Sequence, residues 1–185
     1  FNHTTVNVEA YYKNFSQLTN INRNKVFDDT PDYSNKPEYL RKDFIIERGK
    51  AYGLDFSMKY DYRRVYFWAV YSLGFVTRED EMQEYYPHYD RRHNVNLLLS
   101  YLIGDKLDWE VDLRWNLGSG FAFTKTQGFY ENITFQNGIN HDYTTTNGEL
   151  GIQYSSDLNS GRLPYYHRLD FTVKKKFVIA NNSTL

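Results

Sequence analysis

His88, Asp90 and His93 are the residues whose types and spacing come closest to a metal site. Imidazole nitrogens and carboxylate oxygens are metal ligands, but a site also needs them to converge on one point. In the alternative interpretation, Asp90 pairs with the neighbouring arginines at the entrance of a strand. We favour this second interpretation, and we expect no bound metal and no cofactor.

A second group of ligand-type residues is acidic and comprises Glu79, Asp80, Glu81 and Glu84. Carboxylate oxygens suit calcium. The same run is also typical of a solvated loop that faces outward, and this is the interpretation we favour.

Catalytic chemistry finds little support in the sequence. There is no nucleophile elbow, no glycine-rich phosphate loop and no paired zinc motif. A triad on a barrel wall would need Ser57 or Ser100 to meet His93 or His167, which requires a coincidence of strand register. We therefore assign no catalytic residue and expect a protein that is not an enzyme.

The elements that position these residues show a period of two. From residue 107 to residue 117, every second residue is apolar and those between are polar or charged. Successive side chains of a strand point to opposite faces, so this segment has one apolar and one polar face. The alternation recurs elsewhere in the chain. The predicted strands cover residues of about 4–13, 49–60, 64–77, 93–102, 107–121 and 165–178.

The connections between these strands alternate in length. Tight turns are predicted at 61–63 and 104–106, whereas the links of about 14–46, 78–92 and 124–164 are long. Outer-membrane barrels have short turns at one end and long extracellular loops at the other. The third link contains Asn137-Gly138 and Asn147-Gly148, which are turn signals, and we expect a small hairpin within it.

Composition agrees with a membrane barrel. The chain has 18 Tyr, 13 Phe and 3 Trp, yet its mean hydropathy is -0.71. A barrel in lipid combines aromatic girdles with a polar inner wall and polar loops. A tyrosine-rich soluble β-sandwich remains the alternative.

The net charge of -1 argues against nucleic acid, which would need a basic face. The absence of cysteine excludes a disulfide scaffold.

We predict an all-β fold in which residues 1–185 form one partial outer-membrane β-barrel domain with antiparallel transmembrane strands and long extracellular loops. The smallest membrane barrels have about eight strands. An open sheet edge is not tolerated in lipid. The six predicted strands therefore need more strands, and we expect the sequence to be internal to a longer precursor.

The alternation also assigns side chains to each surface. Tyr60, Tyr101, Trp109 and Phe177 fall near the turn end, where a periplasmic girdle belongs. The side chains expected to face the lumen, as plug or pore contacts, are Asp55, Lys59, Asp108, Glu110, Asp112, Arg114, Arg168, Asp170 and Lys174. The loop tyrosines proposed from expected exposure to contact a ligand or partner are Tyr33, Tyr85, Tyr86, Tyr130 and Tyr143.

Three segments carry a family resemblance: Gly49–Leu54, Tyr89–His93 and Leu163–Asp170. They resemble strand entrances in the C-terminal barrel portion of Bacteroidetes-type TonB-dependent outer-membrane receptors, in that family's order and spacing. The resemblance implies a barrel of about 22 strands that is plugged by an N-terminal domain of the same chain. It further implies a location in the bacterial outer membrane and contact with TonB through a region upstream of this sequence.

Three functions follow from these expectations. The first is a transport receptor that imports an unidentified nutrient. The second is a non-transporting barrel platform that anchors partner proteins, such as surface lipoproteins, in a secretion or surface-display complex. The third is a small soluble β-barrel that binds a ligand. We favour the first, with outer-membrane lipid, the chain's own plug domain and TonB as partners and with no nucleic acid.

Overall fold

The chain folds almost entirely into antiparallel β-structure. The computed structural model describes residues 3–25, 31–132, 149–179 and 183–184. In these ranges the helical elements are two short 3-10 segments, η1 (Pro31–Asn35) and η2 (Glu38–Leu40). No helix of the described ranges is long and apolar enough to cross a membrane. The predicted all-β antiparallel class is confirmed.

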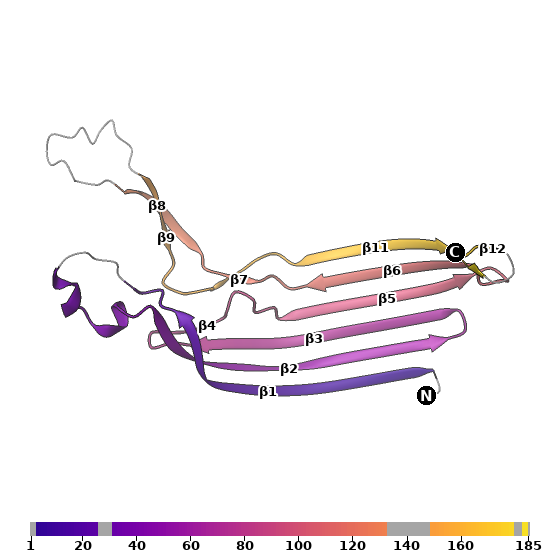
Figure 1. Ribbon diagram of the computed structural model, residues 1–185, viewed down its shortest axis with the longest axis horizontal. Helices are drawn as coiled ribbons and strands as arrows, with labels where there is room; N and C mark the ends of the chain where they lie inside the picture. The colour runs from indigo at the N-terminus through magenta and orange to yellow at the C-terminus, as the bar shows by residue number, and fades with distance from the viewer. Residues whose placement is uncertain (1–2, 26–30, 133–148, 180–182, 185) are drawn as a thin grey trace.

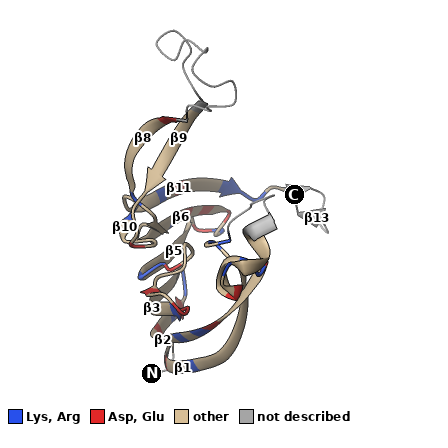
Figure 2. Ribbon diagram, turned by 90° about the vertical axis from the view of Figure 1, so that its left-hand side faces the viewer, with Lys and Arg blue, Asp and Glu red and all other residues tan. Residues whose placement is uncertain are grey.

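One open sheet contains the long strands. They are β1 (Thr4–Ile21), β2 (Phe44–Tyr62), β3 (Val65–Glu79), β5 (His93–Ile103), β6 (Trp109–Gly118) and β11 (Tyr166–Lys175). Each is antiparallel to the next in this order, and the two-residue β4 (Glu84–Tyr85) pairs with the end of β3. The strands follow one another around an arc, with β1 and β11 as the edges (Figure 2). Among the described residues no sheet closes into a barrel.

Several strand boundaries differ from the sequence prediction: β6 ends at Gly118 rather than 121, β11 ends at Lys175 rather than 178, and three further differences have local reasons. β1 and β2 continue to pair beyond a register shift between Phe15 and Leu18. This β-bulge places an extra residue in β1, which interrupts the alternation and hides the continuation of both strands. Leu107, predicted to open a strand, lies in the turn before β6 with a φ of 52°. That backbone conformation is incompatible with a strand.

The long connections all lie at one end of the sheet, and the tight turns lie at the other (Figure 1). β2 and β3 are joined through Arg63 and Arg64, and β5 and β6 through residues 104–108. The three long links leave from the opposite end. We call these the turn end and the loop end.

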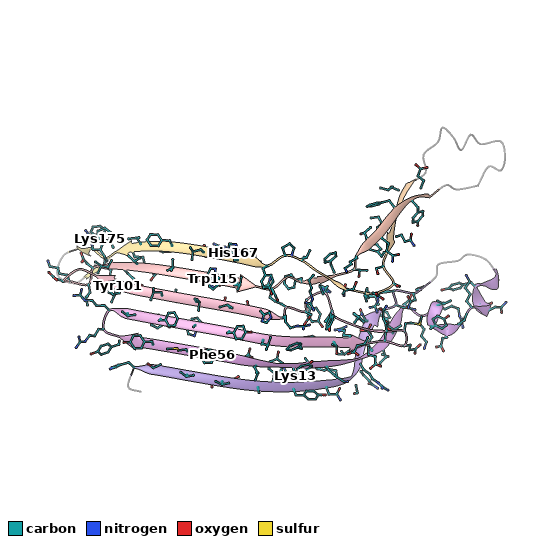
Figure 3. All side chains as sticks on the ribbon, turned by 180° about the vertical axis from the view of Figure 1, so that it is seen from behind. Lys13, Phe56, Tyr101, Trp115, His167 and Lys175 are labelled. Carbon is teal, nitrogen blue, oxygen red and sulfur yellow. The ribbon has the colours of Figure 1, made fainter. Side chains whose placement is uncertain are left out.

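The two faces of the sheet differ in chemistry. Hydrophobic side chains, exposed or partly exposed, occupy every second position of the long strands; Phe56, Tyr101 and Trp115 mark this apolar face in Figure 3. Phe171 is 67% exposed and Val8 65% exposed. Within the described ranges, the buried hydrophobic residues are only Tyr85 and Ala122. The described chain therefore supplies no layer that covers its own apolar face.

Small hairpins extend the loop end. β8 (Thr126–Asn132) pairs with β9 (Glu149–Tyr154), which places a hairpin within the third long link. The turn signals Asn137-Gly138 and Asn147-Gly148 lie outside the described residues. β7 (Ala122–Phe123) pairs with β10 (Gly161–Arg162) at the loop end as well, whereas β12 (Val178–Ile179) pairs with β13 (Ser183–Thr184) at the turn end, beyond β11 (Figure 1).

A tyrosine fits over glycines on the polar face. A Cβ atom built on Gly53 would lie 2.7 Å from the hydroxyl oxygen of Tyr11, and one built on Gly74 would lie 3.2 Å from the same atom. The two glycines are paired across β2 and β3. Their missing side chains make room for the Tyr11 side chain, which reaches from β1 across β2 to β3.

Candidate functional site

The loop end of the polar face is organised by a fully buried carboxylate. Glu47 of β2 has 0% exposure. Its carboxylate oxygens accept hydrogen bonds from the Tyr85 hydroxyl at 2.9 and 3.0 Å and from the Asn20 amide at 3.1 and 3.2 Å. Arg23 and Arg78 form ion pairs with it at 3.4 and 3.3 Å. We call these five residues the Glu47 cluster.

The Glu47 cluster joins segments that are far apart in sequence. Asn20, Glu47 and Arg78 come from β1, β2 and β3, whereas Arg23 comes from the first long link and Tyr85 from the second. Removing a carboxylate from water is costly unless it is paired and hydrogen-bonded. Here the burial is compensated by two guanidinium groups, and the result ties two loops to the sheet.

A second buried carboxylate lies next to the first. Asp90 is 1% exposed. It forms an ion pair with Arg162 of β10 and another with Arg92 at 3.5 Å. Arg162 also donates a 2.6 Å hydrogen bond to the backbone carbonyl of Asp90. The predicted pairing of Asp90 with a neighbouring arginine is seen in its ion pair with Arg92, and Arg162 from the third link joins in the pairing.

Asp90 also replaces a missing backbone partner. Its carboxylate accepts a 3.2 Å hydrogen bond from the amide of Val76, where β3 still pairs with β2 on one side but its pairing with β5 has ended at Leu73. Two residues closer to the turn end, the amide of Gly74 donates to the carbonyl of Arg92 at 3.0 Å. The second long link therefore remains attached to β3 without regular pairing, and Arg162 connects it to the third link.

Arginine side chains at the loop end stack on aromatic rings. The Arg92 guanidinium lies 4.2 Å from the ring centroid of Phe75 and 5.3 Å from that of Tyr86. Arg162 lies 5.1 Å from the same Tyr86 ring, and Arg91 lies 4.3 Å from Phe121. A flat guanidinium is favoured for such stacking because it remains charged and is weakly hydrated.

The end of β6 fits tightly against this assembly. Ser119 and His93 exchange hydrogen bonds, the Ser119 amide to the His93 carbonyl at 2.8 Å and the His93 amide to the Ser119 hydroxyl at 2.9 Å. A Cβ atom on Gly120 would overlap the carbonyl oxygen of Leu163. Glycine is required at 120 because the third link crosses there in direct backbone contact.

Tyr85 was expected to be an exposed loop residue, and this expectation is wrong. Only 6% of Tyr85 is exposed, because its hydroxyl reaches Glu47 and its ring lies under Arg23 at 4.6 Å. Burial, and then the hydrogen bond to Glu47, raises the pKa of the Tyr85 hydroxyl above its ordinary value, while Arg23 opposes the shift. This burial could not be predicted from the sequence because both partners are distant along the chain.

A pH dependence follows from the raised pKa of Tyr85. Its unfolded phenol ionises near pH 10, whereas the folded phenol stays neutral to a higher pH. Its contribution to stability is therefore complete below about pH 10 and is lost as the pH rises through the folded pKa. Backbone hydrogen exchange at residues 80–92, followed from pH 8 to 12 and corrected for the intrinsic exchange rate, should show alkaline opening. In Tyr85→Phe this titration should be absent; an unchanged alkaline profile would contradict it.

The other loop tyrosines have different environments. Tyr86 is 39% exposed and Tyr130 is 54% exposed. Tyr33 lies in η1 and is partly exposed. Tyr143 lies outside the described residues. Exposure therefore leaves Tyr86 and Tyr130 as the better candidates for contact with a ligand or partner.

All the predicted lumen side chains except Asp108, which precedes β6 in the turn, occupy polar-face positions of the long strands. Lys174 forms ion pairs with Asp112 at 2.6 Å and with Glu110 at 3.4 Å, across β11 and β6. Ser100 of β5 donates to Asp112 at 2.6 Å. These four residues line one side of a cavity of about 470 Å³ at the turn end, which Arg64 and Lys176 also line.

The remaining predicted lumen residues are less closely connected. Arg168 forms an ion pair with Asp170 at 2.8 Å, and Arg114 lies opposite Asp170 in register. The Lys59 amine lies 5.3 Å from the ring centroid of Tyr66. Asp55 pairs in register with Ser72 and Glu9, and Asp108 lies in the turn before β6. The polar face thus has charges of both signs and no single centre.

The residues considered above as possible metal ligands contact other side chains and backbone groups. The ring nitrogen Nδ1 of His93 lies 2.9 Å from the Tyr71 hydroxyl, and His88 packs edge-on against Tyr89 at 5.3 Å. In the acidic run, Asp80 pairs with Arg23 at 2.6 Å and accepts from the amides of Met82 and Gln83. The described part of the chain contains no group of three or more potential ligands placed to hold a metal ion.

These features define a class of protein: an open, all-β antiparallel sheet with an uncovered apolar face, a charged face and loops fastened by buried ion pairs. No protein-family model matches the chain, and no curated protein or solved structure is significantly similar to it.

Proposed function

We propose that this chain is part of the wall of an outer-membrane β-barrel that belongs to a TonB-dependent receptor and imports a nutrient. The observation that carries the proposal is the uncovered apolar face, which is bounded by aromatic residues at both ends. Soluble proteins rarely expose contiguous apolar patches of this extent, whereas a lipid-facing wall requires one.

Stacked rings mark the loop-end boundary of the apolar face. Tyr12, Tyr52 and Phe75 are register partners on three strands, with centroid distances of 6.5 Å between the first two rings and 5.0 Å between the last two. At the turn end, Tyr101 and Trp109 occupy the corresponding apolar face. Aromatic rings favour the two interfaces of a bilayer because they have apolar bodies and polar edges.

The separation of the two boundaries fits a bilayer. On β2, Tyr52 marks the loop-end boundary and Tyr62 marks the turn-end boundary, because Tyr62 is level with Tyr101 through Val65. The two tyrosines are ten residues apart. At a rise of about 3.3 Å per residue, this is roughly 33 Å of strand. A strand tilted by about 40°, as in outer-membrane barrels, would cover roughly 25 Å of membrane thickness, which is the height of their apolar band.

The polar face and the loops support a role beyond a simple anchor. A wall with charges of both signs suits hydrogen-bonded contact with a plug inside the barrel, because opposite charges on adjacent strands can pair across or reach inward. The loops at the other end are held in place by Glu47 and Asp90, so they present a fixed surface to a solute. Preorganised loops bind with a smaller loss of conformational entropy.

A second candidate function is a platform for partner proteins, and the β8–β9 hairpin favours it. Phe129 and Ile152 are register partners, so they share one face of this hairpin. They are 65% and 46% exposed, and Leu150 on the same face is 69% exposed. An exposed apolar face on a projecting hairpin suits contact with another protein.

The test of the membrane wall introduces single cysteines, because these 185 residues contain none and any cysteine elsewhere in the polypeptide is first replaced by serine. Leu97→Cys places a label on the apolar face, and Asn96→Cys places the matched control on the polar face of the same strand. In the full-length polypeptide reconstituted in vesicles, nitroxide-bearing lipid should quench a fluorophore at 97 several-fold more than one at 96. Equal quenching at both positions would overturn the proposal.

The import and platform functions predict different sequences upstream of Phe1, so an experiment can distinguish them. The mass and N-terminal sequence of the purified polypeptide should reveal a plug domain and a TonB-contacting segment if the barrel imports a solute. A barrel without a plug that co-purifies with stable loop-bound proteins would instead favour the platform.

A further inference from the structure

The apolar face carries one charged side chain among its otherwise uncharged positions. Between the Tyr12–Tyr52–Phe75 row and the turn end, the apolar-face positions of the described long strands hold no Asp, Glu, Arg or Lys except Lys175. A charge on a lipid-facing surface is costly near the bilayer centre and far less costly at the interface. Lys175 lies at the turn end of β11, beside the final row of the sheet (Figure 3).

Two aromatic rings hold the ammonium group of Lys175. Its Nζ atom lies 4.6 Å from the ring centroid of Trp109 and 5.2 Å from that of Phe177. Both rings are substantially exposed, Trp109 at 40% and Phe177 at 53%. Cation–π contacts fix the position of the ammonium but leave N–H donors available. Within the described residues Lys175 forms no ion pair, unlike its neighbour Lys174.

We propose that Lys175, Trp109 and Phe177 form a binding site for the phosphate of an anionic phospholipid in the leaflet at the turn end. This inference rests on the proposed membrane location. The rings occupy the interfacial depth at which Trp side chains are enriched, and the ammonium beside them meets the headgroup layer. An anionic lipid is favoured over a zwitterionic one because its headgroup carries no cation to oppose the ammonium.

The geometry separates this site from the polar face. Lys176, the next residue, lines the turn-end cavity with Glu110 and Asp112 on the other side of the sheet. Lys175 and Lys176 are therefore two adjacent lysines of which only the first faces lipid. This pair supplies a matched control, since both substitutions remove one positive charge at the same level of the membrane.

The experiment compares Lys175→Gln with Lys176→Gln in the full-length polypeptide. Each variant is reconstituted in vesicles that contain phosphatidylglycerol and phosphatidylcholine, with one or the other lipid brominated. The quenching of tryptophan fluorescence then gives the relative binding constant of the two lipids. We expect Lys175→Gln to lower the preference for phosphatidylglycerol about fivefold, the effect of one basic side chain near an anionic membrane surface. Lys176→Gln and Lys175→Arg should retain it.

Other outcomes have distinct meanings. Equal lipid preference in Lys175→Gln and Lys176→Gln would overturn the lipid site while leaving the membrane wall intact. If inorganic phosphate at millimolar concentration abolishes the preference, the site recognises free phosphate and the lipid assignment is wrong. Failure of the unaltered protein to enter vesicles would overturn the proposed function itself.

Discussion

Replacing Glu47 by alanine should lower the free energy of unfolding by about 3–5 kcal/mol, the usual cost of breaking a buried ion pair from one side. The carboxylate has 0% exposure, and its loss would remove the counter-charge of Arg78 and leave Arg23 paired with Asp80 alone. The hydroxyl of Tyr85 would also lose its acceptor. Urea unfolding of the reconstituted full-length polypeptide, followed by tryptophan fluorescence, measures the change as a shift in midpoint at constant slope.

Two further variants separate the buried charge from general effects. Glu47→Gln preserves volume and some hydrogen bonds, so it should destabilise less than Glu47→Ala. Glu38→Gln removes one member of an exposed ion pair, Glu38–Lys42 at 2.9 Å, and should not shift the midpoint measurably. If Glu47→Ala behaved like Glu38→Gln, the Glu47 cluster would not hold the loops.

Replacing Gly120 by alanine should cost about 3 kcal/mol, at the upper end for overpacking, because the added methyl group would overlap a backbone carbonyl rather than a flexible side chain. Relief requires the chain at Leu163 to move, which would disturb its 2.9 Å hydrogen bond to Phe121 and the adjacent pairing of β10 with β7. Arg162 precedes Leu163, so the ion pair with Asp90 should weaken as well. The same urea titration measures the loss of stability.

Gly128→Ala is the matched control for this substitution. A Cβ atom at Gly128 has no heavy atom within 4 Å, and neither glycine has a positive φ. The two variants therefore have the same effect on the unfolded chain and differ only in the folded surroundings. Comparable destabilisation of both would contradict the close backbone crossing at Gly120.

The sheet could be predicted from the sequence because its rule is local. Asn96 and Leu97 face opposite sides for the same reason that every adjacent pair in a strand does, and six segments repeat the pattern. The all-β antiparallel class followed from this alternation. The alternation misled at Leu107, where a positive φ keeps the chain in the turn and β6 begins only at Trp109.

The buried carboxylates were not predicted in this way. Glu47 occupies a polar-face position like any other, and nothing adjacent to it indicates burial. Its partners Arg23 and Tyr85 come from two different loops, and only the folded chain brings them together. Arg162 was likewise absent from the sequence interpretation of Asp90. For Tyr85, the assumption that loop tyrosines are exposed gave the wrong answer.

The bulge in β1 accommodates one extra residue without changing which side chains of β1 and β2 meet beyond it. Below it, Phe15 pairs with Gly49; above it, Leu18 pairs with Glu47, so two residues of β1 oppose the single residue Arg48. Deleting Ser16 or Gln17 would remove the extra residue and still leave Phe15 opposite Gly49 and Leu18 opposite Glu47, so Asn20 would stay on the side of Glu47. A one-residue deletion at the bulge should therefore be tolerated better than one elsewhere in β1, which would turn the side chains on one side of the deletion to the opposite face.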